Sequence, residues 1–387
     1  MESSAPDREN FVVPDVRDVT LADLALACRL SVATVSSALN GSSRVAASTQ
    51  KRVHATAQQL GYAPNPAARR LALGRARKGG ASTVSEQVGF VVISGSDRCL
   101  DQPYLLMLTG ADREIARHGG NLVFFHCEGA EGMQRLMRMV RQGSIDGWLV
   151  MGFVDEAVRT FFEDLGKPFV VLGDHHSRKP VCSVDVNYRM AGEMAARELA
   201  ALGHRRIGYL GATMRFAYQR ELRDGFRSAV QTLDLDPDPL LIQTGERPGL
   251  TKPGWEAANE LNALLTLPDR PTAFVASEPA TGTTVLSLLR QYELDLPRHA
   301  SLLACDWKNS PEATSGLAMV ELPMEEVGVT GIALLQEQAK SGSEVPSQVR
   351  LTPCWRRGWS SAAPASAPAS GSGETWDELD APAGVNA

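Results

Sequence analysis

The chain has 387 residues, of which 43% are hydrophobic and 22% charged, and its formal net charge is −6. This composition excludes disorder throughout and suits two or three domains with buried cores. The charge is unevenly distributed: residues 17–78 hold ten Lys or Arg and two Asp or Glu, a net of +8, so the remainder carries −14. A basic end on an acidic body indicates that one end of the chain meets a polyanion.

The cysteines and the N-terminus indicate a cytoplasmic protein without membrane contact. The six cysteines are scattered and none has metal-ligand spacing, so we expect reduced, buried thiols and no metal site: Cys28, Cys99, Cys127, Cys182, Cys305 and Cys354. Residues 1–18 carry charges where a signal peptide needs an apolar run, and we expect a disordered tail there. The apolar stretch 148–154 is far too short to span a bilayer.

Residues 19–62 begin with the pattern of two short helices. Thr20 can accept hydrogen bonds from the first turn of the segment that follows it, and Ser31 can cap a second helix after a break at Arg29 and Leu30. Gly41 can end that second helix. Within it we expect one set of side chains to pack inward and another to face outward: Val32, Val35 and Leu39 inward, and Ala33, Thr34, Ser37 and Asn40 outward.

A third helix is expected over 47–60, capped at Ser48 and ended by Gly61. Two short helices joined by a tight turn, with a third across them, are typical of a helix-turn-helix domain. Spacing alone also fits any small three-helix cluster, and the basic charge of this region favours the DNA-binding interpretation.

Residues 63–87, with Pro64, Pro66, a basic run and Gly/Ser, have the composition of a connector. From 88 to 357 apolar runs alternate with amphipathic segments such as 189–202 and 282–292. This alternation predicts an α/β fold with two lobes of doubly wound parallel sheet. The expected strands are 88–93, 121–127, 147–152, 168–173, 206–212, 272–277 and 301–306. Residues 358–387, rich in Ala, Pro, Ser and Gly and then acidic, are expected to be a disordered tail.

The body carries no catalytic motif. No GxGxxG follows the strand 88–93, and Walker, HExxH and GxSxG motifs are absent from the sequence. The adjacent His175 and His176 are expected to be exposed on a loop, and the paired acids Glu325 and Glu326 on the solvated face of a helix. We therefore predict no enzyme activity, no catalytic residue and no cofactor.

Two runs of sequence, VTLADLALACRLSVATVSSALNGSSRV (19–45) and LGYAPNPAARRLALGR (60–75), closely resemble the N-terminal module of the LacI family of transcription repressors. Further runs resemble the ligand-binding core of that family: 201–212, 270–280, 302–316 and 317–328. The resemblance covers about residues 19–357. It implies a helix-turn-helix domain at 19–62, a hinge helix and linker at 63–87, and a two-lobed periplasmic-binding-protein-like core at 88–357.

The resemblance also implies which residues bind DNA. The second helix would enter the major groove with Val32, Ala33 and Ser37 at base-reading positions. Phosphate or groove-edge contacts are implied for Thr20, Leu21, Ser31, Thr34, Asn40, Arg44 and Thr49. Residues 65–72 match the family's hinge helix, which adds Asn65, Arg69, Leu71 and Ala72. Leu71 would wedge into the minor groove, where an apolar side chain unstacks a base step; the alternative is a loop leucine packed on its own domain.

Three departures from the family bear on DNA binding. The family usually has Gly in the turn where this chain has Arg29, and Arg disfavours positive φ, so a locally rearranged turn is expected. The family commonly has Arg where this chain has Ser37, which cannot make a bidentate contact with guanine. An operator outside the usual half-site, or weaker selectivity at one base pair, follows. The longer linker at 78–87 predicts weaker coupling between ligand and hinge.

Four residues are implied as ligand contacts in a cleft between the lobes: Tyr104, Arg189, Glu278 and Asp306. Asp306 would accept hydrogen bonds from ligand hydroxyls, and Tyr104 would stack on a ligand ring. Glu278 stands where the family usually has Asp, and Pro279 is expected to interrupt the start of the following helix. Each residue also has a plain structural alternative, which for Asp306 is a turn residue at a strand end and for Arg189 a surface cation on a helix.

Together these features predict a homodimeric repressor that binds a palindromic double-stranded operator and responds to a small polar effector, a sugar or a related metabolite. The alternative is a small-molecule-binding protein or enzyme of the same fold with a degenerate DNA-binding head. Only Arg29 and Ser37 support that alternative.

Overall fold

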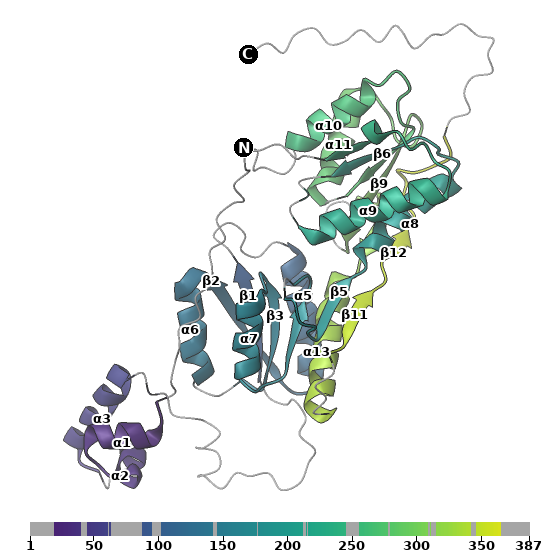
Figure 1. Ribbon diagram of the computed structural model, residues 1–387. Coiled ribbons are helices and arrows are strands. Elements are labelled where there is room, and N and C mark those ends of the chain that lie inside the picture. Colours follow the sequence, from purple (N-terminus) through teal and green to yellow (C-terminus); the bar gives the residue numbers. More distant parts are fainter. Residues whose placement is uncertain are drawn as a thin grey trace, which may run out of the picture. The chain divides into compact units, whose positions relative to one another are not determined.

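The computed structural model (Figure 1) describes residues 19–39, 45–60, 62, 87–94, 102–141, 145–175, 177–211, 214, 216–244, 255–277, 279–308, 310, 315–341 and 346–364. The chain divides into two compact units. Unit 1 comprises Met1–Asn187 and Pro323–Thr352, and unit 2 comprises Tyr188–Leu322 and Pro353–Ala387. The chain thus crosses between the units after Asn187, after Leu322 and after Thr352.

A helical head opens unit 1, with α1 (Leu21–Cys28), α2 (Val32–Leu39) and α3 (Ala47–Leu60). Its core consists of small and medium side chains from all three helices: Leu24, Ala25, Cys28, Val35, Ala38, Val53 and Ala57. The expected third helix is confirmed, but its cap is wrong. The helix begins at Ala47 and the backbone N–H groups of Thr49 and Gln50 donate to Ala46, so Ser48 lies inside the first turn.

Within the part of the chain that the structure describes, no single helix is long and apolar enough to cross a membrane. Helices α1 and α2 pass that test only when taken together, and they are bent by 99° at their junction. An interhelical bend of this size is typical of a helix-turn-helix motif.

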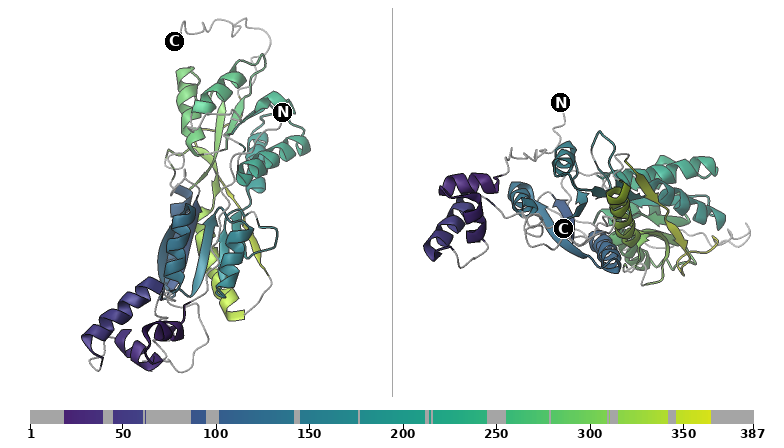
Figure 2. Two further views of the ribbon diagram at one scale, coloured as in Figure 1. Left: turned by 60° about the vertical axis from the view of Figure 1, so that its left-hand side comes forward. Right: turned by 90° about the horizontal axis from the view of Figure 1, so that it is seen from below.

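Unit 1 also contains a parallel sheet with the strand order β11-β5-β4-β3-β1-β2. Its strands are β1 (Gln87–Ser94), β2 (Asn121–Glu128), β3 (Gly147–Gly152), β4 (Phe169–Leu172), β5 (Ser183–Val186) and β11 (Gln348–Leu351). Its helices are α5 (Gln102–Arg117), α6 (Gly129–Arg141), α7 (Glu156–Asp164) and α13 (Met324–Ser341). Helices α6 and α7 cover one face of the sheet, and α5 and α13 cover the other (Figures 1 and 2).

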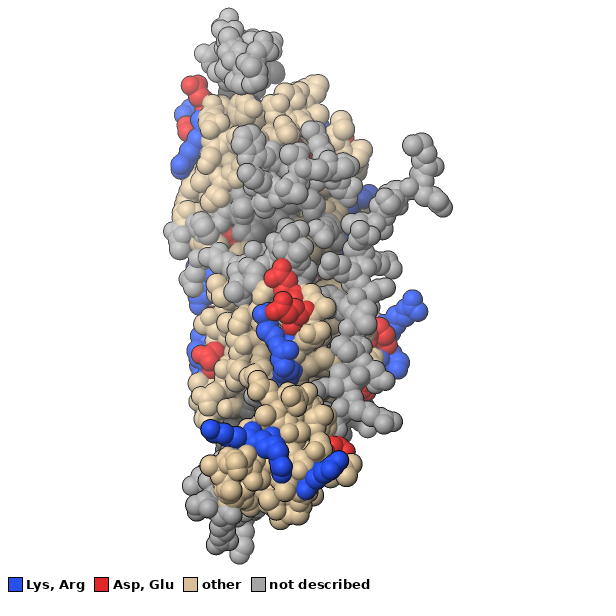
Figure 3. All heavy atoms as spheres, turned by 90° about the vertical axis from the view of Figure 1, so that its left-hand side faces the viewer, with Lys and Arg blue, Asp and Glu red and all other residues tan. Residues whose placement is uncertain are grey.

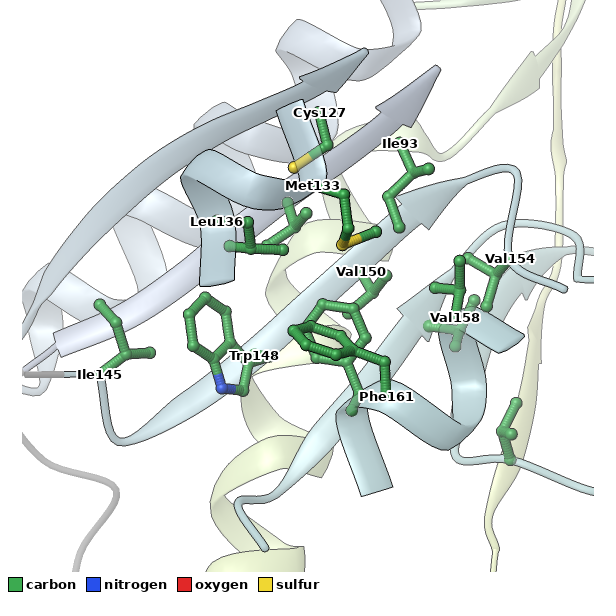
Figure 4. Close-up of a cluster of buried hydrophobic side chains, with 14 residues drawn as sticks. Ile93, Cys127, Met133, Leu136, Ile145, Trp148, Val150, Val154, Val158 and Phe161 are labelled. Atoms are coloured by element: carbon green, nitrogen blue, oxygen red, sulfur yellow. The ribbon is translucent and has the colours of Figure 1, made fainter. Parts of the chain in front are cut away.

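Large apolar side chains fill the space between the unit 1 sheet and helices α6 and α7. Figure 4 shows Met133 and Leu136 of α6 and Phe161 of α7 directed toward Trp148 and Val150 of β3. The Trp148 ring lies 5.7 Å, centroid to centroid, from that of Phe162. Strands covered on both faces need apolar side chains in both directions, which is why their sequences are continuous apolar runs.

Unit 2 contains a second sheet of the same design with the strand order β12-β10-β9-β8-β6-β7. Its strands are β6 (Ile207–Gly211), β7 (Ile242–Thr244), β8 (Ala273–Ala276), β9 (Ser301–Trp307), β10 (Ala318–Leu322) and the antiparallel β12 (Cys354–Arg356). Its helices are α8 (Tyr188–Ala201), α9 (Ala217–Thr232), α10 (Trp255–Leu265) and α11 (Pro279–Gln291), with a 3-10 turn, η1 (Pro239–Leu241).

In each unit, two helices touch through glycines. A Cβ atom on Gly192 of α8 would overlap the carbonyl oxygen of Leu222, and one on Gly225 of α9 would overlap that of Arg189. Helices α5 and α13 of unit 1 repeat this arrangement, since Gly110 faces the backbone of Glu325 and Gly328 faces that of Met107. Both helix pairs can therefore approach closely only because glycine has no Cβ atom at these positions.

The predicted α/β fold with two parallel sheets is confirmed, and each of the seven expected strands is present. The helices expected at 189–202 and 282–292 correspond to α8 and α11. Five strands were not predicted: β5, β7, β10, β11 and β12. They are short, and the two last run through mixed polar sequence near the C-terminus, where the apolar pattern is weak.

The described chain continues to residue 364, beyond the expected start of a disordered tail at 358. Ser360 is fully buried and its hydroxyl donates to the carbonyl of Leu302 at 2.6 Å, while the backbone N–H of Ala318 donates to that hydroxyl at 2.9 Å. Residues 358–364 are thus part of unit 2, because these hydrogen bonds fix them to the sheet.

Candidate functional site

The turn between α1 and α2 contains a left-handed residue, although arginine at that position disfavours positive φ. Arg29 has φ 52° and ψ 44°, in the left-handed region, so the expected rearrangement of the turn is wrong. The backbone N–H of Arg29 donates to Leu26 at 3.0 Å and that of Leu30 donates to Ala25 at 3.0 Å. These bonds satisfy the last carbonyls of α1 and hold Arg29 in place despite its side chain.

Ser31 caps α2 as predicted. Its hydroxyl accepts a hydrogen bond from the backbone N–H of Thr34 at 3.1 Å. The expectation that Val32 packs inward is wrong, because 47% of its side chain is exposed while Val35 and Ala38 are fully buried. Val32 is the first residue of α2, and the contact of this helix with α1 and α3 is made by Val35 and Ala38.

Val32 and Ala33 stand exposed at the start of α2, and Thr34, Ser37 and Leu39 are half-buried. Helix α2 carries no charged side chain in its sequence VATVSSAL. Its exposed surface consequently consists of methyl groups and hydroxyls.

The other head residues implied in DNA contact differ in burial and in hydrogen bonding. Thr20 forms a capping box with Asp23, whose carboxylate accepts from the Thr20 backbone N–H at 2.8 Å and its hydroxyl at 2.7 Å. These hydrogen bonds lower the pKa of Asp23. Leu21 packs against the head core, and Thr49 is half-buried in the first turn of α3. Six expected contacts lie outside the described residues: Asn40, Arg44, Asn65, Arg69, Leu71 and Ala72.

The described part of the head is basic on its surface. Arg29, Lys51 and Arg52 are exposed, and Asp23 is the one acidic residue among 19–39, 45–60 and 62. Figure 3 shows Lys and Arg side chains on the surface of the head. Such side chains can neutralise phosphates without reading sequence.

In unit 2, Asp306 lies near the carboxyl end of β9, next to β10 and β8. The residue is fully buried, and its Oδ1 accepts from the backbone N–H of Trp307 at 2.7 Å. Burial raises the pKa of the adjacent Cys305 thiol, and the Asp306 carboxylate raises it further. Ligands of open α/β sheets bind at the carboxyl ends of the strands, which is where Asp306 lies.

Arg189 lies in the first turn of α8, is half exposed, and its Nε is 3.6 Å from Glu193 Oε1. Tyr104 is half-buried near the start of α5 in unit 1. Glu278 lies outside the described residues. The expectation that Pro279 interrupts the next helix is wrong: α11 begins at Pro279, a position at which proline needs no backbone N–H.

An aromatic cluster at the starts of α8 and α9 was missed from the sequence. The ring of Tyr218 stacks on Phe216 at 5.9 Å and lies 5.3 Å from that of Tyr188. Trp307 is half-buried, and its indole N–H has no acceptor among the described residues. Only their common position at or just after the ends of strands β5, β6 and β9 could have indicated them, since the residues are scattered in sequence.

The predictions that the paired acids and the paired histidines are exposed have different outcomes. The prediction that Glu325 is solvated is wrong, because its side chain is only 17% exposed and its carboxylate lies 2.5 Å from the guanidinium of Arg113. The same prediction for Glu326 is confirmed, since that residue is exposed. His175 is half-buried, and His176 is not described. In the part of the chain that the structure describes, no cluster of three His, Cys, Asp or Glu side chains could hold a metal ion.

Comparisons with known proteins match both parts of the chain. Residues 20–65 match the family described as bacterial regulatory proteins, lacI family, and residues 176–361 match the periplasmic binding protein-like domain. The transcriptional regulator RafR of Escherichia coli is 30% identical over 265 residues, which is 68% of this chain and 74% of RafR.

Two solved structures share the fold. The lac repressor dimer bound to operator and the anti-inducer ONPF has a TM-score of 0.60 at 19% identity, covering 90% of this chain and 100% of that one. The regulator CelR in complex with cellobiose has a TM-score of 0.58 at 21% identity, covering 88% of this chain and 99% of that one. This chain therefore shares the fold of both proteins.

Proposed function

Because this chain belongs to the lacI family of bacterial regulatory proteins and is a DNA-binding transcriptional regulator, we propose that it is a homodimeric repressor of a palindromic operator. The observation that carries this proposal is the head: two helices bent by 99° at a left-handed Arg29, with the capped start of α2 exposed. A regulator of this kind works on chromosomal DNA, so we place it in the cytoplasm.

The DNA contacts remain proposals for individual residues. Val32, Ala33 and Ser37 of α2 are assigned to base edges, supported by the exposure of the first two. Phosphate or groove-edge contacts are assigned to Thr20, Leu21, Ser31, Thr34 and Thr49, with Asn40 and Arg44 beyond the described residues. The hinge residues Asn65, Arg69, Leu71 and Ala72, and the domain boundaries at 18/19, 62/63 and 87/88, are likewise predictions.

The effector is assigned to the four residues that the resemblance implies, Asp306, Arg189, Tyr104 and Glu278, of which Glu278 lies outside the described residues. A buried carboxylate at the carboxyl end of β9 suits a ligand with hydroxyl groups, since it can accept hydrogen bonds away from water. The CelR complex contains cellobiose, which supports a sugar or a similar polar metabolite. An Asp306→Asn variant should bind such a ligand more weakly than the wild-type protein, as measured by calorimetry.

The degenerate-head alternative loses one of its two supports. Arg29 departs from the family residue, yet the turn keeps the left-handed conformation that the motif needs. The Ser37 departure concerns which base is read and leaves the helix intact. One matching relative, RafR, is named as a transcriptional regulator and not as an enzyme.

The test is selection of bound DNA from a random duplex pool by the full-length protein, with a chain lacking residues 1–78 as the control. We expect a palindrome that only the full-length protein enriches, with binding that weakens steeply as salt rises because several phosphates are neutralised. Enrichment of the same sequence by both proteins, or of no sequence by either with and without candidate sugars, would contradict the proposed function.

A further inference from the structure

The exposed start of α2 has chemistry that fits one kind of base edge. Val32 is 47% exposed, Ala33 is exposed, and no side chain of α2 carries a charge or an amide. The helix therefore lacks the guanidinium and amide groups that make bidentate hydrogen bonds to guanine or adenine. What it offers at its first turn is a pair of apolar side chains.

The position of these side chains is fixed locally. The Ser31 hydroxyl accepts from the Thr34 backbone N–H at 3.1 Å, which sets the start of the helix at Val32. Val35 and Ala38 are fully buried one turn apart and pack α2 against the head core, whereas Val32, the first residue of the helix, lies outside that contact. Val32 belongs neither to the head core nor to the partly buried side chains around it, so its exposure is a property of the folded head.

The N-terminal residues of the second helix of this motif contact base edges in the major groove. The thymine C5-methyl is the apolar group that the groove presents, and small aliphatic side chains contact it. We propose that Val32 and Ala33 read thymine through its 5-methyl group, so that each operator half-site carries thymine opposite the first turn of α2. This inference rests on the proposed function and names the base chemistry of that same interface.

Leu26 provides the contrast within the head. Its side chain is 80% exposed, more than that of Val32, but it belongs to α1. The first helix of the motif crosses the DNA backbone and does not enter the groove. An exposed aliphatic side chain on α1 therefore has no thymine methyl to contact, and Leu26→Ala is a matched control.

The experiment uses the full-length protein and the palindrome that it selects. Each thymine of the half-site is replaced by deoxyuridine in both half-sites at once, which removes the methyl group and keeps the base pairing. Loss of one buried methyl contact should weaken binding about fourfold per half-site, hence about fifteenfold for the duplex. We expect this loss at one or two positions of the half-site and none at the others.

Protein variants then connect the methyl group to the side chain. In Val32→Ala the deoxyuridine effect at that position should shrink to about twofold or less for the duplex, because alanine lacks the two γ-methyl groups that extend from Val32 to the thymine methyl. In Leu26→Ala it should stay at the wild-type value. Val32→Ala should fold normally, since the lost side chain is half exposed and Ala favours helix more than Val does; circular dichroism checks this.

Three outcomes would overturn the inference while leaving the proposed function intact. They are a selected palindrome without thymine in the half-site, deoxyuridine substitutions that change affinity at no position, and a deoxyuridine effect of equal size in Val32→Ala and wild type. Selection of no palindrome contradicts the proposed function itself, and the thymine inference falls with it.

Discussion

The cores of the head and of the lobes are built from side chains of different size. Three short helices close the head around Leu24, two valines, three alanines and a cysteine. The lobes enclose Trp148, Phe162, Tyr209 and Phe226, all nearly or fully buried. The head is held by neighbours in sequence and by caps at Thr20 and Ser31, whereas one sheet is covered by two helices that lie more than 200 residues apart in the chain, α5 and α13.

This difference predicts separate vulnerabilities. A core of small side chains tolerates little loss of volume, since few other contacts remain to support it. A pair of helices in backbone contact tolerates little gain of volume, because there is no space for a new side chain. Two substitutions test these two statements, and two smaller effects, of acid on the lobes and of a glycine in the head, extend the comparison.

Truncation of Leu24 should have the largest effect. Leu24→Ala removes a fully buried side chain from the head and should lower the free energy of its unfolding by about 3–4 kcal/mol. We expect the head to unfold at ordinary temperature, with operator binding lost and the calorimetric transition of the lobes unchanged. A shift of the lobe transition by the same amount would show that head and lobes unfold as one unit.

Gly225→Ala should destabilise unit 2 by about 2–3 kcal/mol, because the added Cβ overlaps the Arg189 carbonyl oxygen at the α8–α9 contact. Calorimetry should show a lower lobe transition and a normal head. Gly166→Ala is the control: φ is 59° but nothing lies within 4 Å of the new Cβ. It should lose only about 1–2 kcal/mol, the cost of left-handed backbone in a residue with a Cβ. Equal losses in the two variants would argue against a close helix contact.

Acid should weaken unit 2 through His204. Its Nδ1 accepts from the Thr272 hydroxyl at 2.8 Å and its Nε2 donates to the Ala362 carbonyl at 2.9 Å, in a site that is 1% exposed. Burial lowers its pKa below the ordinary value of 6.5, so the unfolded chain binds the proton more tightly.

Stability contributed by neutral His204 is therefore complete above pH 6.5 and falls as the pH drops below that value. Denaturant unfolding of the wild-type protein at several pH values should show this decline. His204→Gln should unfold at lower denaturant concentration at neutral pH and lose the part of the pH dependence due to this side chain. An unchanged slope between pH 5 and 6.5 in the variant would contradict the assignment.

Arg29→Gly should have the smallest effect and the opposite sign. Glycine relieves the left-handed strain at φ 52° but gains freedom in the unfolded chain, so the head should be more stable by at most about 1 kcal/mol. The melting temperature of the head checks this, with Arg52→Gly, in the interior of α3, as a control that should lower it. A large loss on Arg29→Gly would mean that the arginine side chain itself holds the turn.

Much of this protein follows from local sequence signals. Ser31 and Thr20 marked the helix starts of the head, and the apolar runs marked seven strands of the two sheets. The position of Asp306 near the end of β9 could also be predicted, since it ends an apolar run. These features depend on hydrogen bonds and patterns within a few residues, which a sequence displays directly.

The errors came where contacts between distant segments decide. Val32 has the spacing of a core residue, but Val35 and Ala38 occupy the contact with α1 and α3. Glu325 has the sequence context of a solvated helix, but Arg113 of α5 faces it. Ser360 lies in a segment of low complexity, but its hydroxyl bonds to the strands that begin at Ser301 and Ala318.

The sequence by itself determined the class of the protein, the order of its parts and the caps and strands that build them, because each depends on neighbouring residues. Only the tertiary structure decided that Arg29 holds a left-handed turn, that Val32 stands outside the head core, and that Gly192 and Gly225 bring α8 and α9 into backbone contact. The exposure of Val32 and the contact between α8 and α9 depend on which residue lies opposite in space, and that neighbour is set by the packing of one helix on another. Arg29 is held by the hydrogen bonds that end α1, which outweigh the preference of its own residue type.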